Sequence, residues 1–167
     1  MNEHETAPRS GFHHPDEHLD AGMVMLQANI DDMNPEWCSY VGERLFEAGA
    51  NDVFWIPIIM KKGRPGVMLN VLTAEDKLQA IEKVVFAETT TIGLRYMQVT
   101  CHRLARRFFP VETKWGTITV KAGYQDGRLT QFAPEFAECE RAAREHGVPL
   151  KDVYDEVRRR FDRTSGL

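Results

Sequence analysis

The sequence predicts an α+β fold: a ferredoxin-like βαββαβ layer followed by a β-hairpin region and two C-terminal helices. Three observations indicate this. Strand-length apolar runs alternate with helical apolar stripes in the order βαββαβ over residues 23–102. Turn signals typical of β-hairpins then follow, at residues 114–116 and at Asp126-Gly127. Helical spacing returns twice after these turns, each time after a proline.

The first strand is expected at Met23–Ala28, a short apolar run. Asn34 is a favourable N-cap residue and Pro35 suits the first helical turn, so a helix is expected to begin there. Gly49 is expected to end this helix. Its apolar stripe consists of Val41, Leu45 and Ala48.

Three further strands complete the layer, and they are expected at Asp52–Met60, Val67–Leu72 and Ile92–Cys101. The turn Lys61–Gly66 joins the first two of these strands. Thr73 is expected to cap the second helix, with Asp76 completing a near capping box. The apolar stripe of that helix is Leu78, Ile81 and Val85.

The C-terminal part begins with a hairpin. Residues 108–112 and 117–122 are its two strands, and residues 114–116 form the turn between them. Asp126-Gly127 is a strong signal for a tight turn, after which residues 129–132 can pair back.

Two helices follow. Pro134 opens the first, which Gly147 ends, and Pro149 opens the second. Their stripes are Phe136, Cys139 and Ala143 in the first, and Leu150, Val153, Tyr154, Val157 and Phe161 in the second. The run Arg158–Arg160 is interpreted as a solvated helix end, where cations suit the helix dipole.

Composition restricts the class of protein. The 167 residues suit one domain, or one domain with a small appendage, and the net charge of -4 disfavours a general nucleic-acid surface. No apolar run reaches the roughly 20 residues that span a bilayer. The three cysteines (Cys38, Cys101 and Cys139) are far apart and are expected to be free thiols in a reducing cytoplasm.

The expected organisation is a His-bearing tail over residues 1–22 and an ordered domain over residues 23–163. That domain comprises the ferredoxin-like part, residues 23–102, and the hairpin with two helices, residues 103–163. The histidines at 13, 14 and 18 leave two interpretations open, a flexible solvated tail or a weak site for a divalent metal.

An acidic cluster follows the first strand: Asn29, Asp31, Asp32, Asn34 and Glu36. Dense oxygen ligands at a strand-to-helix junction suit a hard cation such as Mg²⁺ or Mn²⁺. Capping of the helix is the alternative, since carboxylates favour its positive end. The two adjacent aspartates ahead of the cap are what capping leaves unexplained.

A basic cluster occupies the next turn and consists of Lys61, Lys62 and Arg64 beside Gly63 and Gly66. Glycine lets the backbone approach a ligand, and cations this close together form a compact phosphate site. A solvated hairpin turn explains the same residues. The turn is not a Walker A loop, because no GxxxxGK[ST] pattern occurs in the sequence.

A hydroxyl cluster lies between the second helix and the fourth strand: Thr89, Thr90, Thr91, Gly93 and Arg95. These groups can hold phosphate oxygens, or the hydroxyls can bond to the local backbone. The sequence leaves open whether this cluster lies at the same end of the sheet as the other two. No catalytic residue is predicted.

A weaker basic group follows the fourth strand: His102, Arg103, Arg106 and Arg107. A solvated strand end is the simplest interpretation. Basic and aromatic side chains do not alternate on one strand face here, which disfavours an RNA-binding domain.

Five runs of the sequence resemble the nickel-insertion protein family of LarC type. They are Asn29–Glu36, Leu45–Ala50, Pro57–Gly66 (PIIMKKGRPG), Glu88–Arg95 and Glu145–Lys151, in that order. The resemblance covers residues 25–154, and a string of ten residues such as PIIMKKGRPG is a specific signal.

The resemblance implies a C-terminal domain that binds CTP with Mg²⁺ or Mn²⁺ and assembles into a hexameric ring. Proteins of this family insert Ni²⁺ into a pyridinium bis-thiocarboxylate mononucleotide to form the nickel-pincer cofactor of lactate racemase. Mapped onto this sequence, the candidate nucleotide contacts are Lys61, Lys62, Arg64, Thr89, Thr90, Thr91 and Arg95. Asp31 and Asp32 are the candidate ligands of the metal that accompanies the nucleotide.

The family's N-terminal domain has no counterpart in these residues. We therefore expect the chain to hold CTP, while nickel insertion requires that domain, in the same chain or in another. The alternative function is a non-catalytic ferredoxin-like module for regulation or oligomerisation.

Overall fold

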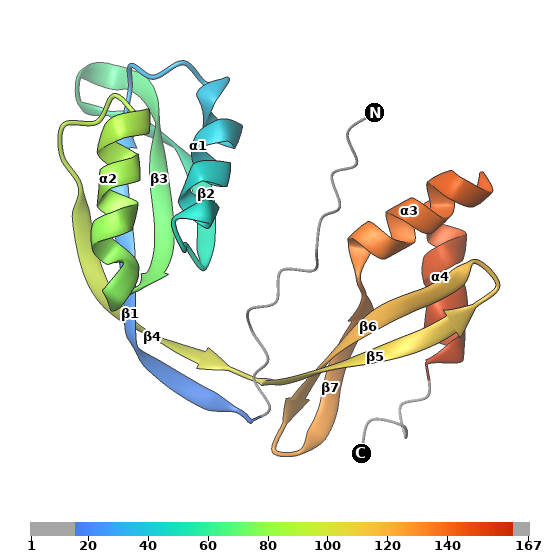
Figure 1. Ribbon diagram of the computed structural model, residues 1–167. Coiled ribbons are helices and arrows are strands. Elements are labelled where there is room, and N and C mark those ends of the chain that lie inside the picture. Colours follow the sequence, from blue (N-terminus) through green and yellow to red (C-terminus); the bar gives the residue numbers. More distant parts are fainter. Residues whose placement is uncertain (1–15, 162–167) are drawn as a thin grey trace. The chain divides into compact units, whose positions relative to one another are not determined.

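The computed structural model describes residues 16–161, which form two compact units (Figure 1). One unit comprises Leu19–Cys101, and the other comprises residues 102–161 together with residues 16–18. Each unit has a hydrophobic core of its own. The expected tail lies largely outside the described residues, as do its histidines at positions 13 and 14.

The first unit is a four-stranded sheet with two helices, in strand order β2-β3-β1-β4. Its elements are β1 (His18–Ile30), α1 (Trp37–Glu47), β2 (Asp52–Met60), β3 (Arg64–Ala74), α2 (Leu78–Glu88) and β4 (Arg95–Arg103), with short 3-10 turns η1 (Lys61–Gly63) and η2 (Glu75–Lys77). β3 is antiparallel to both β1 and β2. The order and direction of the strands confirm the predicted ferredoxin-like βαββαβ layer.

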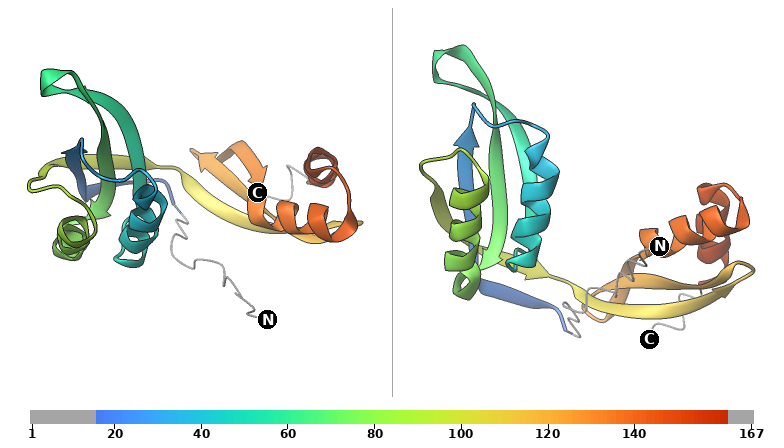
Figure 2. Two further views of the ribbon diagram at one scale, coloured as in Figure 1. Left: turned by 90° about the horizontal axis from the view of Figure 1, so that it is seen from above. Right: turned by 45° about the horizontal axis from the view of Figure 1, so that its top comes forward.

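Both helices cover the same face of this sheet (Figure 2). Leu26, Leu69 and Ile81 are fully buried between sheet and helices. Burying each such side chain stabilises the fold by about 1.5–3 kcal/mol. Because side chains alternate along a strand, the opposite face of the sheet carries the intervening residues, among them Gln27 and Phe54.

The second unit is a three-stranded sheet, β5-β6-β7, with two helices. Its elements are β5 (Ala105–Thr113), β6 (Gly116–Gln125), β7 (Arg128–Pro134), α3 (Phe136–His146) and α4 (Leu150–Arg160). The predicted hairpin, third strand and two helices are confirmed. Asp126 and Gly127 both have positive φ, 49° and 72°, as the tight turn between β6 and β7 requires.

Several predicted boundaries were wrong. β1 begins at His18, inside the expected tail. The regular part of α1 begins at Trp37 instead of Asn34, although the Asn34 side chain does accept a hydrogen bond from the Glu36 N–H at 3.1 Å. β4 begins at Arg95, so the expected strand residues Ile92–Leu94 belong to a loop.

Thr73 does not cap a helix. It is fully buried in β3, where it pairs with Val24 of β1, and α2 begins only at Leu78. Its hydroxyl donates to the Ala74 carbonyl at 3.4 Å. Sheet pairing and burial therefore outweigh the capping tendency of threonine at this position.

The stripe of α3 was also partly wrong. Cys139 and Ala142 are its buried residues, whereas Phe136 is 56% exposed. The three cysteines are free thiols, with Cys139 buried and the other two half-buried, as predicted. Burial, and then the nearby Glu138 and Glu135 carboxylates, raise the pKa of the Cys139 thiol to about 11. Within residues 16–161, no helix is both long and apolar enough to cross a membrane.

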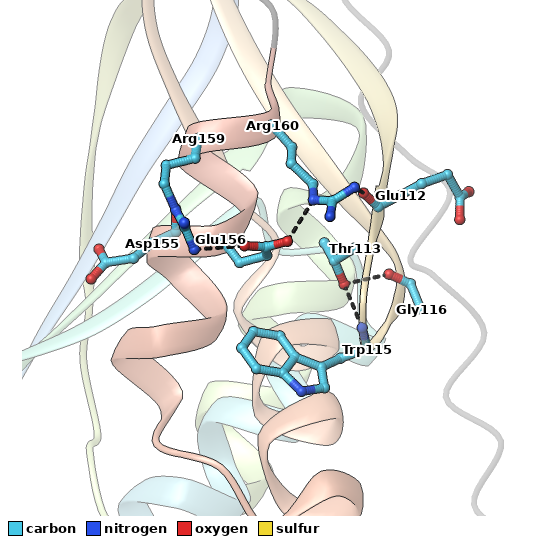
Figure 3. A network of polar contacts seen from close by, with 8 residues as sticks. All are labelled: Glu112, Thr113, Trp115, Gly116, Asp155, Glu156, Arg159 and Arg160. Atoms are coloured by element: carbon cyan, nitrogen blue, oxygen red, sulfur yellow. Dashed lines mark hydrogen bonds and ion pairs between the residues drawn. The ribbon is translucent and has the colours of Figure 1, made fainter.

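The arginine run at the end of α4 is more than a solvated helix end (Figure 3). Arg159 and Arg160 both bond to Glu156, at 2.6 and 2.5 Å, and that carboxylate is only 6% exposed. Arg160 also donates to the Glu112 carbonyl of β5 at 3.3 Å. The hydrogen bond from Arg160 lowers the pKa of the Glu156 carboxyl. These arginines therefore compensate a buried charge and fasten α4 to the sheet.

Candidate nucleotide site

Three connecting segments meet at one end of the four-stranded sheet (Figure 1). They follow β1 (residues 31–36), join β2 to β3 (residues 61–63), and join α2 to β4 (residues 89–94). β1 and β2 run in the same direction, since β3 is antiparallel to both, and so they end at the same edge. The acidic, basic and hydroxyl clusters, whose relative position the sequence left open, are thereby brought together.

The acidic and basic clusters are in direct contact. The Arg64 guanidinium donates to the Asp31 carboxylate at 3.3 Å. A glycine makes this approach possible: a Cβ on Gly66 would lie 2.6 Å from the Ile30 carbonyl oxygen and 3.3 Å from the Asp31 Cα. From the sequence, Gly66 was expected to let the backbone approach a ligand. In the structure, the missing side chain of Gly66 lets β3 approach the end of β1.

The turn that carries the cations is tightly wound. Lys62 and Gly63 have φ of 64° and 70°, in the left-handed region. Lys61, Lys62 and Arg64 are exposed. The turn thus presents its cations to solvent at the same edge as the aspartates.

The hydroxyl cluster divides between two kinds of contact. The Thr90 hydroxyl donates to the Asp32 carboxylate at 2.5 Å. Thr89 bonds to the Val85 carbonyl at 2.7 Å and Thr91 to the Gly93 carbonyl at 2.8 Å, so both make the local backbone bonds of the alternative interpretation. Thr90 therefore links this segment to the acidic cluster, and its neighbours shape the loop.

Arg95 lies on the face of the sheet that the helices leave uncovered. Its guanidinium donates to Asn29 at 3.1 Å and to Gln27 at 3.2 Å. Gln27 in turn donates to Asn70, which is 2% exposed, at 2.7 Å. The sequence prediction missed Gln27, although a polar residue two positions before Asn29 on an apolar strand signals a shared sheet face.

Two members of the acidic cluster do not join the site. Asn34 and Glu36 bond to each other in the turn that precedes α1, and no side-chain hydrogen bond caps that helix at Glu36. Asp31 and Asp32 remain, and the described residues contain no group of three or more His, Cys, Asp or Glu side chains suited to a metal. Two carboxylates do not make a resident metal site. They do fit Mg²⁺ or Mn²⁺ whose remaining ligands are phosphate oxygens and water.

A hollow adjoins the hydroxyl cluster between α1 and α2. It measures about 310 Å³ and is lined by Trp37, Tyr40, Glu88 and Thr89, among others. Trp37 and Tyr40 are 46% and 51% exposed, and the Tyr40 hydroxyl lies 3.5 Å from the Glu88 carboxylate. An aromatic surface of this kind can receive a planar ring. The sequence prediction did not include these two aromatic residues.

Comparison with known proteins identifies the family. The family model described as "Nickel insertion protein" matches residues 9–154. The pyridinium-3,5-bisthiocarboxylic acid mononucleotide nickel insertion protein of Clostridium acetobutylicum is 50% identical over 133 residues, which cover 80% of this chain and 32% of that relative. The protein of the same name from Thermotoga petrophila is 42% identical over 143 residues, which cover 86% of this chain and 36% of that relative. This chain thus spans about a third of the length of these relatives.

Solved structures agree. LarC2, described as the C-terminal domain of a cyclometallase involved in the synthesis of the NPN cofactor of lactate racemase, is 38% identical and superimposes with a TM-score of 0.80 over 86% of this chain and 98% of LarC2. A Methanopyrus kandleri protein, 22% identical with a TM-score of 0.61 over 83% and 87% of the two chains, shares the fold. The chain belongs to the nickel insertion protein family and corresponds to the C-terminal domain of its LarC members.

Proposed function

We propose that this chain is the nucleotide-binding part of a CTP-dependent nickel insertase that matures the nickel-pincer cofactor. One observation carries the proposal: contacts from Arg64 to Asp31 and from Thr90 to Asp32 join cations, hydroxyls and carboxylates at one sheet edge. This combination suits a triphosphate with its metal, because phosphate needs cationic and hydroxyl donors while the metal needs carboxylate oxygens.

Each group has a definite role in this proposal. Lys61, Lys62 and Arg64 hold the phosphates, with Arg95 as a further donor. The hydroxyls of Thr89, Thr90 and Thr91 donate to phosphate only by giving up their bonds to Val85, Asp32 and Gly93. Asp31 and Asp32 hold the Mg²⁺ or Mn²⁺ of the nucleotide, and that ion supplies positive charge that offsets the phosphates. Trp37 and Tyr40 offer an aromatic surface to the base. Ni²⁺ is the metal to be inserted and is a substrate in this scheme.

Calorimetry of CTP binding in the presence of Mn²⁺ tests the site. Lys61→Ala combined with Lys62→Ala removes two cations from the turn and is expected to weaken binding by about tenfold or more. Lys83→Ala combined with Lys151→Ala makes the same charge change at exposed positions outside the site and should leave affinity unchanged. Equal affinities for the two double variants would remove the phosphate role of the turn.

The chain spans about a third of the length of its relatives, which motivates a division of the reaction between parts of the protein. We propose that the chain binds CTP alone, and that transfer of Ni²⁺ to the pyridinium bis-thiocarboxylate mononucleotide needs the remaining part of the protein. Adding that part as a separate chain should restore insertion. Insertion by this chain alone would contradict the division.

The second candidate is a regulatory or oligomerisation module, and the uncovered sheet face favours it. Phe54, Ile56 and Met97 are 38%, 37% and 47% exposed there, and exposed apolar groups of this kind mark association surfaces. We propose that the chain forms a homo-oligomer, a hexameric ring by family resemblance. Light scattering measures its mass. An oligomer that fails to bind CTP would favour the module over the nucleotide-binding function.

A further inference from the structure

The cations of the basic cluster differ in what they contact. Lys61 and Lys62 are exposed, and neither makes an ion pair within the part of the chain that the structure describes. Arg64 instead donates to the Asp31 carboxylate at 3.3 Å. One of the three cations is therefore already held by an acidic group of the chain itself.

Carboxylate and phosphate are alternative partners of one guanidinium, because both can offer two oxygens to its planar fork. The Asp31 side chain is 21% exposed and that of Arg64 is 60% exposed, so Arg64 is the partner more accessible to a ligand from solvent. A phosphate that reaches Arg64 has two courses. It displaces Asp31, or it binds with that carboxylate beside it, and repulsion between like charges makes either course costly.

The second aspartate adds to this opposition. Asp32 accepts a hydrogen bond from the Thr90 hydroxyl at 2.5 Å, so this donor is also directed at a carboxylate of the chain. A metal-free triphosphate brings only negative charge to this place. With a divalent ion on Asp31 and Asp32, in contrast, Asp31 gains another positive partner and Arg64 is released to bind phosphate.

We propose that Asp31 is a specificity-determining residue: it competes with metal-free phosphate for Arg64 and so restricts the site to the metal-bound nucleotide. This inference rests on the proposed function and adds a second role to that of metal ligand. Loss of the Asp31 carboxylate then has opposite effects under two conditions. Binding of the metal-free nucleotide becomes stronger, and binding of the metal-bound nucleotide becomes weaker.

Calorimetry on the full chain tests the proposal. In the presence of a chelator, the probes are inorganic triphosphate and CTP. Asp31→Ala is expected to bind both about two- to fivefold more tightly than the wild type, since exposed ion pairs contribute modestly. In the presence of Mn²⁺, the same variant is expected to bind CTP more weakly than the wild type. Asp31→Asn, which keeps the shape of the side chain, is the second variant and should change both affinities in the same directions.

Removal of any nearby negative charge also favours an anion, and two comparisons separate this effect from competition for Arg64. Asp32→Ala removes an equal charge whose partner is Thr90, so its gain in the chelator should be smaller. In an Arg64→Gln background, Asp31→Ala should gain no more than Asp32→Ala does, because the contested guanidinium is absent.

Two results would overturn the proposal when circular dichroism shows the fold intact. One is the absence of any gain in the chelator for Asp31→Ala and Asp31→Asn. The other is a gain for Asp31→Ala that is equally large in the Arg64→Gln background. If the wild type binds CTP with Mn²⁺, either result contradicts this inference alone. A wild type that does not bind CTP with Mn²⁺ contradicts the proposed function and this inference together.

Discussion

The Asp31 carboxylate and the Arg64 guanidinium lie 3.3 Å apart, although 33 positions separate them in the sequence. Gly66 permits this contact because it lets β3 approach the end of β1. Ile30 and Val67 are paired at that point. The geometry of the candidate site therefore depends on a residue with no side chain to offer a ligand.

Gly66→Ala is expected to destabilise the fold and to weaken CTP binding. Its Cβ would lie 2.6 Å from the Ile30 carbonyl oxygen, so backbone must move, at a cost of about 1–3 kcal/mol. Urea denaturation measures the free energy of unfolding. Gly42→Ala in α1 is the matched control: a Cβ there meets nothing within 4 Å, and alanine should stabilise the helix by about 0.5–1 kcal/mol. Equal effects at the two glycines would contradict the steric argument.

Asp31 and Asp32 should be the residues through which Mn²⁺ strengthens CTP binding. With Asp31→Asn and Asp32→Asn combined, we expect Mn²⁺ no longer to strengthen CTP binding, since the site loses both of its carboxylates. Calorimetry with Mn²⁺ and with a chelator compares the two conditions. Glu36→Gln serves as the control, because Glu36 bonds to Asn34 instead of joining the site. A Mn²⁺ effect that survives in the double variant would place the ion elsewhere.

Gln27 is expected to matter for stability more than an exposed glutamine does. Gln27→Leu removes the partner of the side-chain carbonyl oxygen of Asn70, which is buried, and an unsatisfied buried group costs about 1–3 kcal/mol. Gln98→Leu, at an exposed position of β4, is the comparison. The difference in free energy of unfolding between the two variants measures the buried amide contact, and the absence of any difference would show that Asn70 finds another partner.

The stabilising effect of Glu156 should depend on pH. The pKa of its carboxyl is lowered from the ordinary 4.5, chiefly by the hydrogen bond from Arg160, so its ionised form favours the folded state. This stabilisation is fully present above pH 4.5 and is lost as the pH falls through the lower, folded-state pKa. Glu156→Gln should therefore lower the melting temperature at neutral pH, and the difference from the wild type should shrink in acid.

The matched control for this effect is Glu140→Gln on α3. Glu140 pairs with Arg144, whose side chain is 78% exposed, and such surface pairs contribute about 0–1 kcal/mol. Its effect on melting should be small throughout the pH range. A melting difference for Glu156→Gln that does not change with pH would assign its effect to packing instead of charge.

Thiol labelling should distinguish Cys139 from Cys101. Cys139 is fully buried and its pKa is raised to about 11, so the reactive thiolate is scarce and inaccessible. We expect Cys139 to react only when the protein unfolds, and half-buried Cys101 to react in the native state. Mass spectrometry of the labelled peptides measures each rate. Labelling of Cys139 as fast as Cys101 would show that α3 opens readily.

The sequence was sufficient to predict the order of the elements, because apolar periodicity and turn residues are local properties. Its errors occurred where a tertiary contact outweighed a local preference. Thr73 has the chemistry of a cap, yet pairing with Val24 keeps it in the sheet. Ile92 looked like the start of a strand, yet the Thr91 hydroxyl bonds within the loop and the chain enters β4 only at Arg95.

The meeting of the three clusters could not be predicted for a related reason. The residue types at positions 31, 64 and 90 were visible in the sequence, but their contacts depend on the register of three strands. A shift of one residue in the pairing of β1 with β3 would turn Asn29 from the uncovered face toward the helices. The resemblance to the family suggested CTP as the ligand. It did not indicate which side chains of the three clusters would contact one another.

The two hydrophobic cores also have a consequence for thermal unfolding. Residues 19–101 and 102–161 enclose separate apolar clusters, so heating can disrupt one before the other. A ligand that binds only the folded form raises the melting temperature of the part that holds it. Scanning calorimetry of the unaltered protein would therefore show which half of the chain holds CTP: the nucleotide should shift the transition of residues 19–101 and leave the other unchanged.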